Sequence, residues 1–483
     1  MSAPGESVDP RGRAAVAAAA LVTALVLVLW SAIRGVDGDE GFYLTAGRHV
    51  LEGRRLYADV FYPQMPYLPW MEAIVFRSFG VSLATGRALS IAAGSIAAAI
   101  VTWLIWRIEG SIRAALLAAV LYVSHGPSLH MLCLAKTYGP TDMFLLVAFA
   151  PFALGAARSA TWAFASGAAA AFAIGVRLPA AAVASVLAVL ALREGRRSFF
   201  AFVCGALVGS SGWLLAAASH PQQFWFCNVT FHSLRREISG LVPILTQKAA
   251  VIAKWTFLPQ NIIVWALVAV GLWKGPQRRW PAAFCGLALA AALATATPTY
   301  LQYMVHFFPF ALLAAGPALV AMSRRRALTA VVLGAYLLGV YPAVRAVPAE
   351  NELAGKRQLW ERDTVFDVAQ FIRAHSGEND SVLSWWEGYP VLSGRPGFVG
   401  VGFWEANVAK KLSADAAKRY HVVRQEEIET LISARVPSVI VTTADNWRQH
   451  KKQIDVGYEL AHTTANIEVY LRRERRAAAQ ALS

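Results

Sequence analysis

The chain has 483 residues, of which 57% are hydrophobic and only 16% are charged, and its mean hydropathy is +0.45. These values are outside the usual range of soluble proteins and predict an α-helical polytopic membrane protein, with room for about ten spans of roughly 20 residues. The formal net charge is +15, and the four cysteines have neither CxxC nor metal-ligand spacing, so no redox chemistry is indicated. The sequence contains no GxxxxGK[ST] and no HExxH, which argues against a nucleotide phosphate loop and a zinc-peptidase helix.

Apolar runs fill the first 346 residues and are separated by short basic clusters. Because Lys and Arg concentrate in cytoplasmic loops, we assign every cluster to the cytoplasm, which predicts about eleven transmembrane helices. The predicted spans cover residues 14–34, 84–106, 112–128, 140–157, 160–176, 179–193, 198–218, 255–273, 280–297, 299–322 and 327–346. The chain is then a multi-pass protein of the plasma (inner) membrane, with a cytoplasmic amino terminus and an external loop over residues 35–83. The first apolar run lacks a small-x-small cleavage site before Asp37, so we expect it to stay as an anchor.

The external loop begins with carboxylates and continues into a proline-rich aromatic stretch. Residues 41–53 are predicted to form a short amphipathic helix that ends at Gly53. The segment PYLPWMEAIVFRSFG is apolar but too short to span, so we expect it to lie along the membrane interface. Asp39 and Glu40 stand at the mouth of the first span, where burying an ionised carboxylate is costly, and are therefore expected to have a function or a partner. Glu52 and Asp59, taken alone, are typical of solvated loop residues.

Basic residues also accumulate on the predicted outer face, where the positive-inside rule does not call for them. They are Arg48, Arg54, Arg55, Lys136, Arg177, Arg235 and Arg236. Any one of them alone is explained by a side chain that extends from a helix end into water. Their accumulation predicts a site for an anionic head group such as a phosphate.

The C-terminal residues differ in composition from the rest of the chain. Residues 347–483 contain 18 basic and 18 acidic residues, whereas residues 1–346 contain 27 and 12. We therefore predict a transmembrane domain over 1–346 and a small soluble extracytoplasmic α/β domain over 347–483. The patterns predict helices near DTVFDVAQFIRAHS and EEIETLISARV, strands at SVLSWW and SVIVTT, and a final hairpin near YELAHTTANIEVYLRR. We expect this domain to cover the site or select the acceptor. Trp385, Trp386 and Tyr389 are candidates for stacking on sugar, although core packing is expected for at least one of the tryptophans.

Four features occur together in the external loop: an acidic pair just after the first span, a tyrosine three residues on, an LYxD motif and a proline-flanked aromatic segment. These features are formed by Asp39, Glu40, Tyr43, Leu56, Tyr57, Asp59, Pro63 and Pro66. The loop thereby resembles the first external loop of the GT-C membrane glycosyltransferases, particularly protein O-mannosyltransferase-like and lipid A aminoarabinose transferase-like enzymes. Weaker similarity extends to GVSLATGRALSIAAGSIAAAI, GVRLPAAA and TYLQYMVHFFPFALLAAGP. The resemblance covers most of the chain in architecture, but only about 35 residues at motif level.

The resemblance implies transfer of a sugar from a polyprenyl-phosphate carrier to an acceptor hydroxyl on the outer side of the membrane, with inversion. Phosphate is a good leaving group, so a single carboxylate that removes the acceptor proton can suffice. Asp39 fits this base, and Glu40 would orient it or hold the acceptor. The expected ligands of the donor phosphate are Lys136, Arg177, Arg235 and Arg236. The residues expected to line the substrate are Tyr43, Tyr57, Asp59, Tyr138, Tyr300 and His306.

The implied partners are a polyprenyl-phosphate-linked sugar, the lipid bilayer and an acceptor that is a glycan, a lipid or a protein. No nucleic acid is expected. No cofactor is firmly implied, and a divalent metal has no support from residue spacing. Two other classes stay open, a multi-span transporter of an anionic solute and a catalytically inactive relative that scaffolds envelope assembly. The absence of an internal repeat and the external position of the acids argue against the transporter.

The sequence departs from the aminoarabinose branch in its external loop. That branch places a basic residue shortly after the acidic pair and a lysine just before paired prolines, whereas this chain has Phe42 and Gln64 there. The prolines are split as PQMP. For this reason the phosphate ligands are assigned to the basic residues named above.

Overall fold

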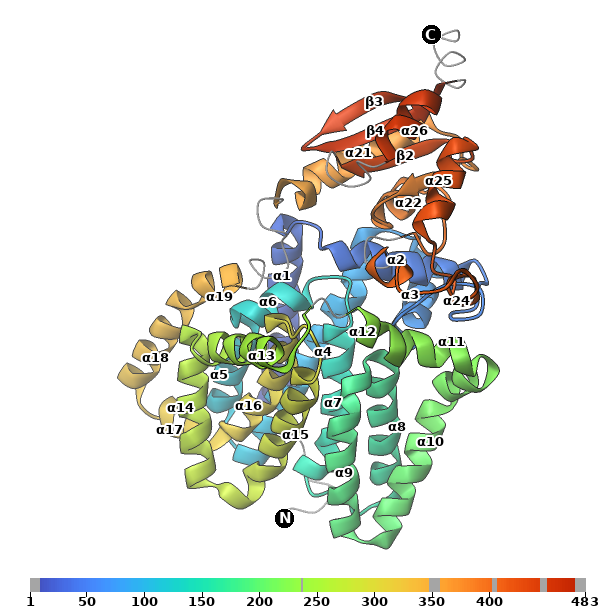
Figure 1. The fold of residues 1–483 in the computed structure, drawn as a ribbon. Helices are drawn as coiled ribbons and strands as arrows, with labels where there is room; N and C mark the ends of the chain where they lie inside the picture. Colours follow the sequence, from blue (N-terminus) through green and yellow to red (C-terminus); the bar gives the residue numbers. More distant parts are fainter. Residues whose placement is uncertain (1–8, 236–237, 347–356, 402–405, 444–449, 474–483) are drawn as a thin grey trace. The chain divides into compact units, whose positions relative to one another are not determined.

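The computed structural model describes residues 9–235, 238–346, 357–401, 406–443 and 450–473 (Figure 1). The chain separates into two compact units, each made of three segments. The first, which we call the helical unit, contains residues 1–32, 87–214 and 237–351. The second, the composite unit, contains residues 33–86, 215–236 and 352–483. Most of the predicted external loop therefore belongs to the same unit as the C-terminal segment.

The described part of the helical unit is built from helices rich in alanine and leucine, which favour this conformation. They are α1 (Pro10–Ile33), α4 (Leu83–Glu109), α5 (Ile112–Val123), α6 (Gly126–Leu132), α7 (Tyr138–Ala153), α8 (Ala160–Val176), η1 (Leu178–Ala180), α9 (Ala181–Glu194), α10 (Arg196–Ser219), α13 (Leu241–Thr256), α14 (Pro259–Lys274), α15 (Pro276–Ala294), η3 (Leu301–Phe307), α16 (Phe308–Ala314), α17 (Gly316–Ser323), α18 (Arg326–Leu338) and α19 (Val340–Ala346). Helices α7, α8 and α9 pack against one another and lie side by side in Figure 1.

Small residues allow α8 and α10 to approach closely. Gly205 and Gly209 lie on one face of α10, and a Cβ at either position would come within 2.4 Å of a carbonyl oxygen of α8. Small residues spaced four apart are typical of helix contacts in membranes, where backbones pack without a hydrophobic driving force. The contact between α10 and α8 is therefore of the kind that occurs between helices inside a membrane.

Within the described ranges, four helical stretches are long and apolar enough to cross a membrane: α1, α4, α10 and residues 326–345. Three bent pairs raise the number to as many as seven by length and composition, and they turn by 68° (α5 with α6), 77° (α13 with α14) and 59° (η3 and α16 with α17). Pro259 and Pro317 lie at the second and third of these bends, where proline disfavours a continuous helix. The chain is thus a multi-pass membrane protein. Each of the eleven predicted spans overlaps a helix, although their exact number stays a prediction and α13 was not foreseen.

The C-terminal part of the composite unit contains a four-stranded sheet of order β1-β2-β4-β3, whose strands are β1 (Val382–Ser384), β2 (Val439–Thr443), β3 (Tyr458–Thr464) and β4 (Ile467–Arg472). Strands β1 and β2 are parallel and the other pairs are antiparallel. The helices around it are η4 (Arg357–Trp360), α21 (Arg362–His375), α22 (Gly388–Ser393), α23 (Ala406–Ala409), α24 (Ala414–Arg419), α25 (Gln425–Ser433) and α26 (Lys451–Gly457). Every helix and strand that the sequence predicted in this segment is confirmed, because buried Val and Ile mark the strands and amphipathic repeats mark the helices.

The rest of the composite unit consists of short helices from the two earlier segments. They are α2 (Gly38–Leu51), α3 (Tyr67–Phe79), α11 (Pro221–Trp225), the π-helix η2 (Phe226–Thr230) and α12 (Phe231–Leu234). Helix α2 agrees with the amphipathic helix predicted at residues 41–53, and Gly53 follows it with a φ of +83°. Helix α3 forms within the predicted interfacial segment and leaves Ile74 and Phe79 exposed.

Helix α2 packs directly on α22 through backbone. A Cβ on Gly41 would lie 2.6 Å from the Cα of Gly388, so only glycine allows this approach. The indole Nε1 of Trp386 donates to the carbonyl of Gly38 at 2.7 Å, and the Thr45 hydroxyl donates to the carbonyl of Glu387 at 3.2 Å. The contacts fix α2 on the C-terminal segment.

The aromatic residues near this contact are part of the core. Trp385, Trp386 and Tyr389 are 4%, 2% and 0% exposed. The prediction that they stack on sugar is therefore wrong, since their rings are covered by protein. Their packing holds α22 against η4, where Trp360 contacts both tryptophan rings at centroid distances of 5.6 and 5.2 Å.

Candidate active site

The predicted acidic pair occupies the first turn of α2. Asp37 is the N-cap, and its Oδ1 accepts a hydrogen bond from the Asp39 N–H at 3.0 Å. In return the Glu40 Oε2 accepts from the Asp37 N–H at 2.9 Å, which completes a capping box. Glu40 is fully buried, whereas Asp39 is half-buried. Asp39 is therefore the more accessible residue of the pair, and the observed hydrogen bond of Glu40 is structural.

A further carboxyl group lies beside Glu40. Glu72 of α3 is 1% exposed, and neither of its carboxyl oxygens has a hydrogen-bond partner among the described residues. Burial raises the pKa of Glu72 well above its usual range, and the nearby Glu40 carboxyl raises it further. These two influences favour the protonated form of Glu72, which avoids two buried negative charges side by side.

The other loop residues that the resemblance singled out contact the protein itself. The Tyr57 hydroxyl donates to the carbonyl of Gln64 at 2.6 Å, and its ring is 1% exposed. Both carboxylate oxygens of Asp59 accept from Arg55, and these hydrogen bonds lower the pKa of Asp59 to about 2. Tyr43 is also buried. These contacts stabilise the loop, and the role of the three residues in lining the substrate stays a prediction.

Within the helical unit, Asp142 and His306 meet although 164 residues separate them. The His306 Nδ1 lies 2.5 Å from the Asp142 Oδ1, and the two side chains are 0% and 1% exposed. The His306 Nε2 and the Asp142 Oδ2 have no hydrogen-bond partner among the described residues. Asp142 lies one turn into α7, whose first turn accommodates Pro140. The pair has the arrangement in which a carboxylate orients an imidazole and leaves its second nitrogen available.

Arg177 lies between two tyrosine rings of the same unit. Its Cζ is 4.8 Å from the ring centroid of Tyr138 and 5.0 Å from that of Tyr303. Its Nη1 donates to the Thr137 Oγ1 at 3.0 Å, and Tyr138 stacks on His306 at 4.9 Å between ring centroids. A guanidinium fixed between rings keeps a fixed orientation and a positive charge. We refer to Tyr138, Asp142, Arg177, Tyr303 and His306 as the basic–aromatic cluster.

The helix η3 explains why several residues of one short segment contribute here. In a 3₁₀-helix, residues three apart lie on the same side. Tyr303 and His306 satisfy this spacing, and Tyr300, the residue that precedes η3, contacts Tyr303 at 5.5 Å between ring centroids. The sequence predicted Tyr300 and His306 but missed Tyr303, which their spacing by three could have shown.

The four predicted phosphate ligands have different surroundings. Lys136 is buried in the helical unit, where the Ser90 hydroxyl donates to its carbonyl at 3.1 Å. Arg177 belongs to the basic–aromatic cluster. Arg235 follows α12 in the composite unit and is half-buried, while Arg236 lies outside the described residues. Asp142 was not predicted, although a lone carboxylate within an apolar run is a recognised signal of function.

A metal site does not emerge from the described residues. No group of three or more His, Cys, Asp or Glu side chains that could hold a metal ion occurs among them.

Comparison with solved structures finds similar folds along nearly the whole chain. ArnT from Cupriavidus metallidurans, solved bound to undecaprenyl phosphate, is 16% identical with a TM-score of 0.68, and the match covers 94% of this chain and 97% of ArnT. The Archaeoglobus fulgidus oligosaccharyltransferase AglB, solved with an inhibitory peptide and a dolichol-phosphate, is 13% identical with a TM-score of 0.53, over 96% of this chain and 74% of AglB. No family model and no curated protein sequence matches the chain. The chain therefore shares its fold with ArnT and AglB, and this agrees with the architecture that the external loop led us to expect.

Proposed function

We propose that this chain, whose fold is that of the GT-C membrane glycosyltransferases, transfers a sugar from a polyprenyl-phosphate donor to an acceptor hydroxyl, with inversion. The observation that carries the proposal is the structural similarity to ArnT bound to undecaprenyl phosphate across 94% of this chain and 97% of ArnT. Because one fold can host several functions, the proposal also needs suitable chemistry in this chain. That chemistry is a reachable carboxylate and fixed cations.

In the proposed reaction Asp39 removes the proton of the acceptor hydroxyl. Its position in the first turn of α2 holds it on a rigid element, and its backbone N–H is bonded to Asp37. The hydroxyl oxygen attacks the anomeric carbon of the donor as the bond to the phosphate oxygen breaks. A phosphate leaves without a strong general acid, so the second carboxylate that glycosidases require is unnecessary. Burial of Glu40 in the capping box supports a mechanism with a single base.

The cations neutralise the departing phosphate in this proposal. Arg177 is favoured for the role because Tyr138 and Tyr303 fix its guanidinium, and a preorganised donor stabilises developing charge without reorganising. Lys136 and Arg235 are proposed as further ligands. The Asp142–His306 pair would bind or orient donor oxygens through the His306 Nε2.

The function is tested by incubating membranes that contain the protein with radiolabelled polyprenyl-phosphate sugars. We expect transfer of the label, and Asp39→Asn should lower saturated turnover by about 10² or more, because the amide cannot take a proton. Asp59→Asn is the matched control, since its carboxylate is held by Arg55, and it should change turnover less than about twofold. Normal turnover in Asp39→Asn would assign the base to another residue. Solute uptake without label transfer would favour the transporter.

We also propose that the amino terminus is cytoplasmic and that Asp39 and the C-terminal segment are external, in the plasma membrane. The regular basic clusters support this orientation. A cysteine introduced as Ser381→Cys should react with a membrane-impermeant thiol reagent in intact cells. Labelling that requires prior opening of the inner side would contradict the orientation and with it an external reaction.

A further inference from the structure

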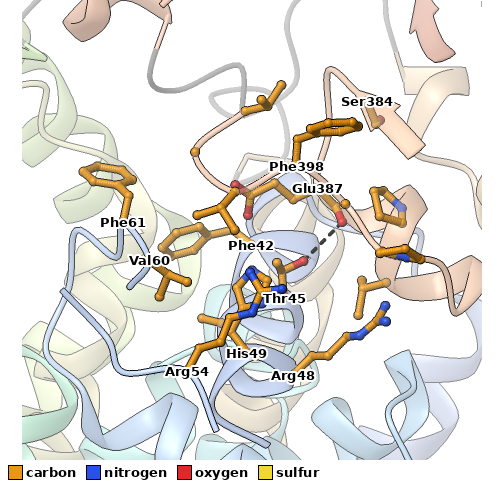
Figure 2. A pocket seen from close by; sticks show the side chains of 18 of the residues that line it. Phe42, Thr45, Arg48, His49, Arg54, Val60, Phe61, Ser384, Glu387 and Phe398 are labelled. Atoms are coloured by element: carbon orange, nitrogen blue, oxygen red, sulfur yellow. Dashed lines mark hydrogen bonds between the residues drawn. The ribbon is translucent and has the colours of Figure 1, made fainter. Parts of the chain in front are cut away.

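A cavity of about 230 Å³ opens inside the composite unit, beside α2 (Figure 2). Phe42, Thr45 and His49 line it from α2, and Phe398 lines it from the segment between α22 and residue 401. None of these residues was assigned to a site by the sequence, apart from the departure noted at Phe42. The lining combines phenyl rings with neutral and charged hydrogen-bonding groups, which is the composition of a specific small-molecule pocket.

Two phenyl rings offer apolar surface to an occupant. Phe42 is half-buried, and Tyr62 stacks on it at 5.2 Å between ring centroids with an interplanar angle of 8°. Phe398 is also half-buried and packs partly against the core of the sheet. Both rings are therefore held in place and still partly accessible. The faces of such rings are electronegative and attract the weakly positive C–H groups on one side of a pyranose.

The polar groups that line the cavity can form hydrogen bonds with hydroxyl groups of a ligand. His49 Nδ1 is buried, has no hydrogen-bond partner within the described part of the chain, and lies 3.6 Å from Glu52 Oε2. Burial, and then the charge of Arg54, lowers the pKa of His49 to about 4. At neutral pH the ring is therefore neutral and offers one donor and one acceptor, which matches a hydroxyl. Arg54 is half-exposed and lies 3.7 Å from Glu52, so its guanidinium retains donors for a ligand.

The formal charges around the cavity balance. Arg48 and Arg54 are matched by Glu52 and Glu387, and Arg48 is committed to the Glu52 carboxylate at 2.7 Å and to the Arg395 carbonyl at 2.8 Å. A site for phosphate would instead show an excess of unpaired cations. Balanced charge together with aromatic faces favours a neutral, hydroxyl-rich ligand.

We infer that this cavity binds one neutral saccharide residue, held between Phe42 and Phe398 and hydrogen-bonded by His49, Thr45 and Arg54. Its volume suits a single pyranose ring, so the rest of the molecule would continue outside. Resting on the proposed function, this saccharide belongs to the acceptor, which makes the acceptor a glycan or a glycan-bearing molecule. The cavity selects the acceptor, and the chemistry stays with Asp39.

The test measures binding of methyl α-D-mannopyranoside, methyl α-D-glucopyranoside and N-acetylglucosamine to the full chain in lipid nanodiscs, by saturation-transfer NMR and calorimetry. We expect at least one to bind with a millimolar Kd, as is typical of a single small ligand. Phe398→Leu keeps the apolar volume but removes the ring face, and His49→Ala removes the buried imidazole. Each should weaken binding about tenfold or more, while near-UV circular dichroism and the melting temperature show that the protein is folded.

Two controls separate the cavity from other parts of the chain. Phe79→Ala removes an exposed phenyl ring of α3 that does not line the cavity, and it should leave binding unchanged. Asp39→Asn should also bind the saccharide normally, because Asp39 is not in the lining.

Failure of all three saccharides to bind, or binding that Phe398→Leu and His49→Ala leave intact, would overturn the inference. Binding of inorganic phosphate in place of the pyranosides would overturn it in favour of an anion site. Saccharide binding that the variants abolish, in a protein without transferase activity, would uphold the cavity and reject the proposed function.

Discussion

Carboxylates of the external loop differ in their hydrogen-bond partners from Asp142, the carboxylate of the basic–aromatic cluster. In the loop, Glu40 accepts from the N-cap backbone and Asp59 accepts from Arg55, so these two acids are satisfied by neighbours in sequence. In the cluster, Asp142 reaches His306 on a distant element, and each side chain keeps one buried polar atom without a partner among the described residues. Acids that are dense in a sequence can thus serve local structure, while a single acid in an apolar run keeps unused hydrogen-bonding capacity.

The largest effect is expected from removal of the His306 imidazole. His306→Ala would strand the Asp142 carboxyl in a buried setting, which should lower the free energy of unfolding by about 3 kcal/mol. Asp142→Asn keeps an acceptor oxygen for His306 and should cost less. Thermal unfolding in detergent measures both variants. If His306→Ala unfolds at the wild-type temperature, the pair does not stabilise the unit.

The next effect concerns the cation of the cluster. Arg177→Lys keeps the charge but loses the planar group between Tyr138 and Tyr303. If the guanidinium holds the phosphate equally in the ground and transition states, the donor KM should rise about tenfold with a smaller change in kcat. Kinetics against donor concentration measures this split. The conservative variant Tyr303→Phe retains a ring face and is the matched control. An unchanged KM in Arg177→Lys would remove Arg177 from the phosphate site.

The last prediction concerns a pH dependence from the loop, whose effect within one pH unit is small. An unperturbed glutamate carboxyl has a pKa of 4.5, and burial raises the pKa of Glu72 in the folded protein. The folded state therefore binds more protons than the unfolded state above pH 4.5. Stability therefore falls as pH rises from 4.5 towards the folded pKa, by up to about 1.4 kcal/mol per pH unit. Glu72→Gln should remove this slope and become relatively more stable at higher pH. The melting temperatures of the wild-type protein and Glu72→Gln are measured between pH 5 and 8. If they change in parallel with pH, Glu72 is ionised in the folded protein.

Local patterns predicted the elements of the fold well. SVIVTT became β2, DTVFDVAQFIRAHS became most of α21, and residues 41–53 correspond to α2, because periodicity and caps act within a few residues. The external loop motif also indicated an architecture that the solved structures of ArnT and AglB share. These signals need no knowledge of distant contacts.

The candidate site was predicted only in part. The sequence identified Arg177 and His306 but not Asp142 as the partner of His306, since 164 residues separate the pair. It also placed Trp386 on a binding surface, whereas the indole is buried against α2. The missing information is tertiary, because burial and partner choice depend on which distant segments pack together.

The contact between α2 and α22 has a consequence for how the protein folds during its synthesis. The residues joined by the Trp386–Gly38 hydrogen bond are 348 positions apart, and the nascent α2 emerges long before α22 is translated. During that interval the close-fitting backbone around Gly41 has no partner, and pairing over such a separation delays closure of the unit until synthesis is nearly complete. A chain that ends before α22, which begins at Gly388, therefore leaves α2 without this packing partner.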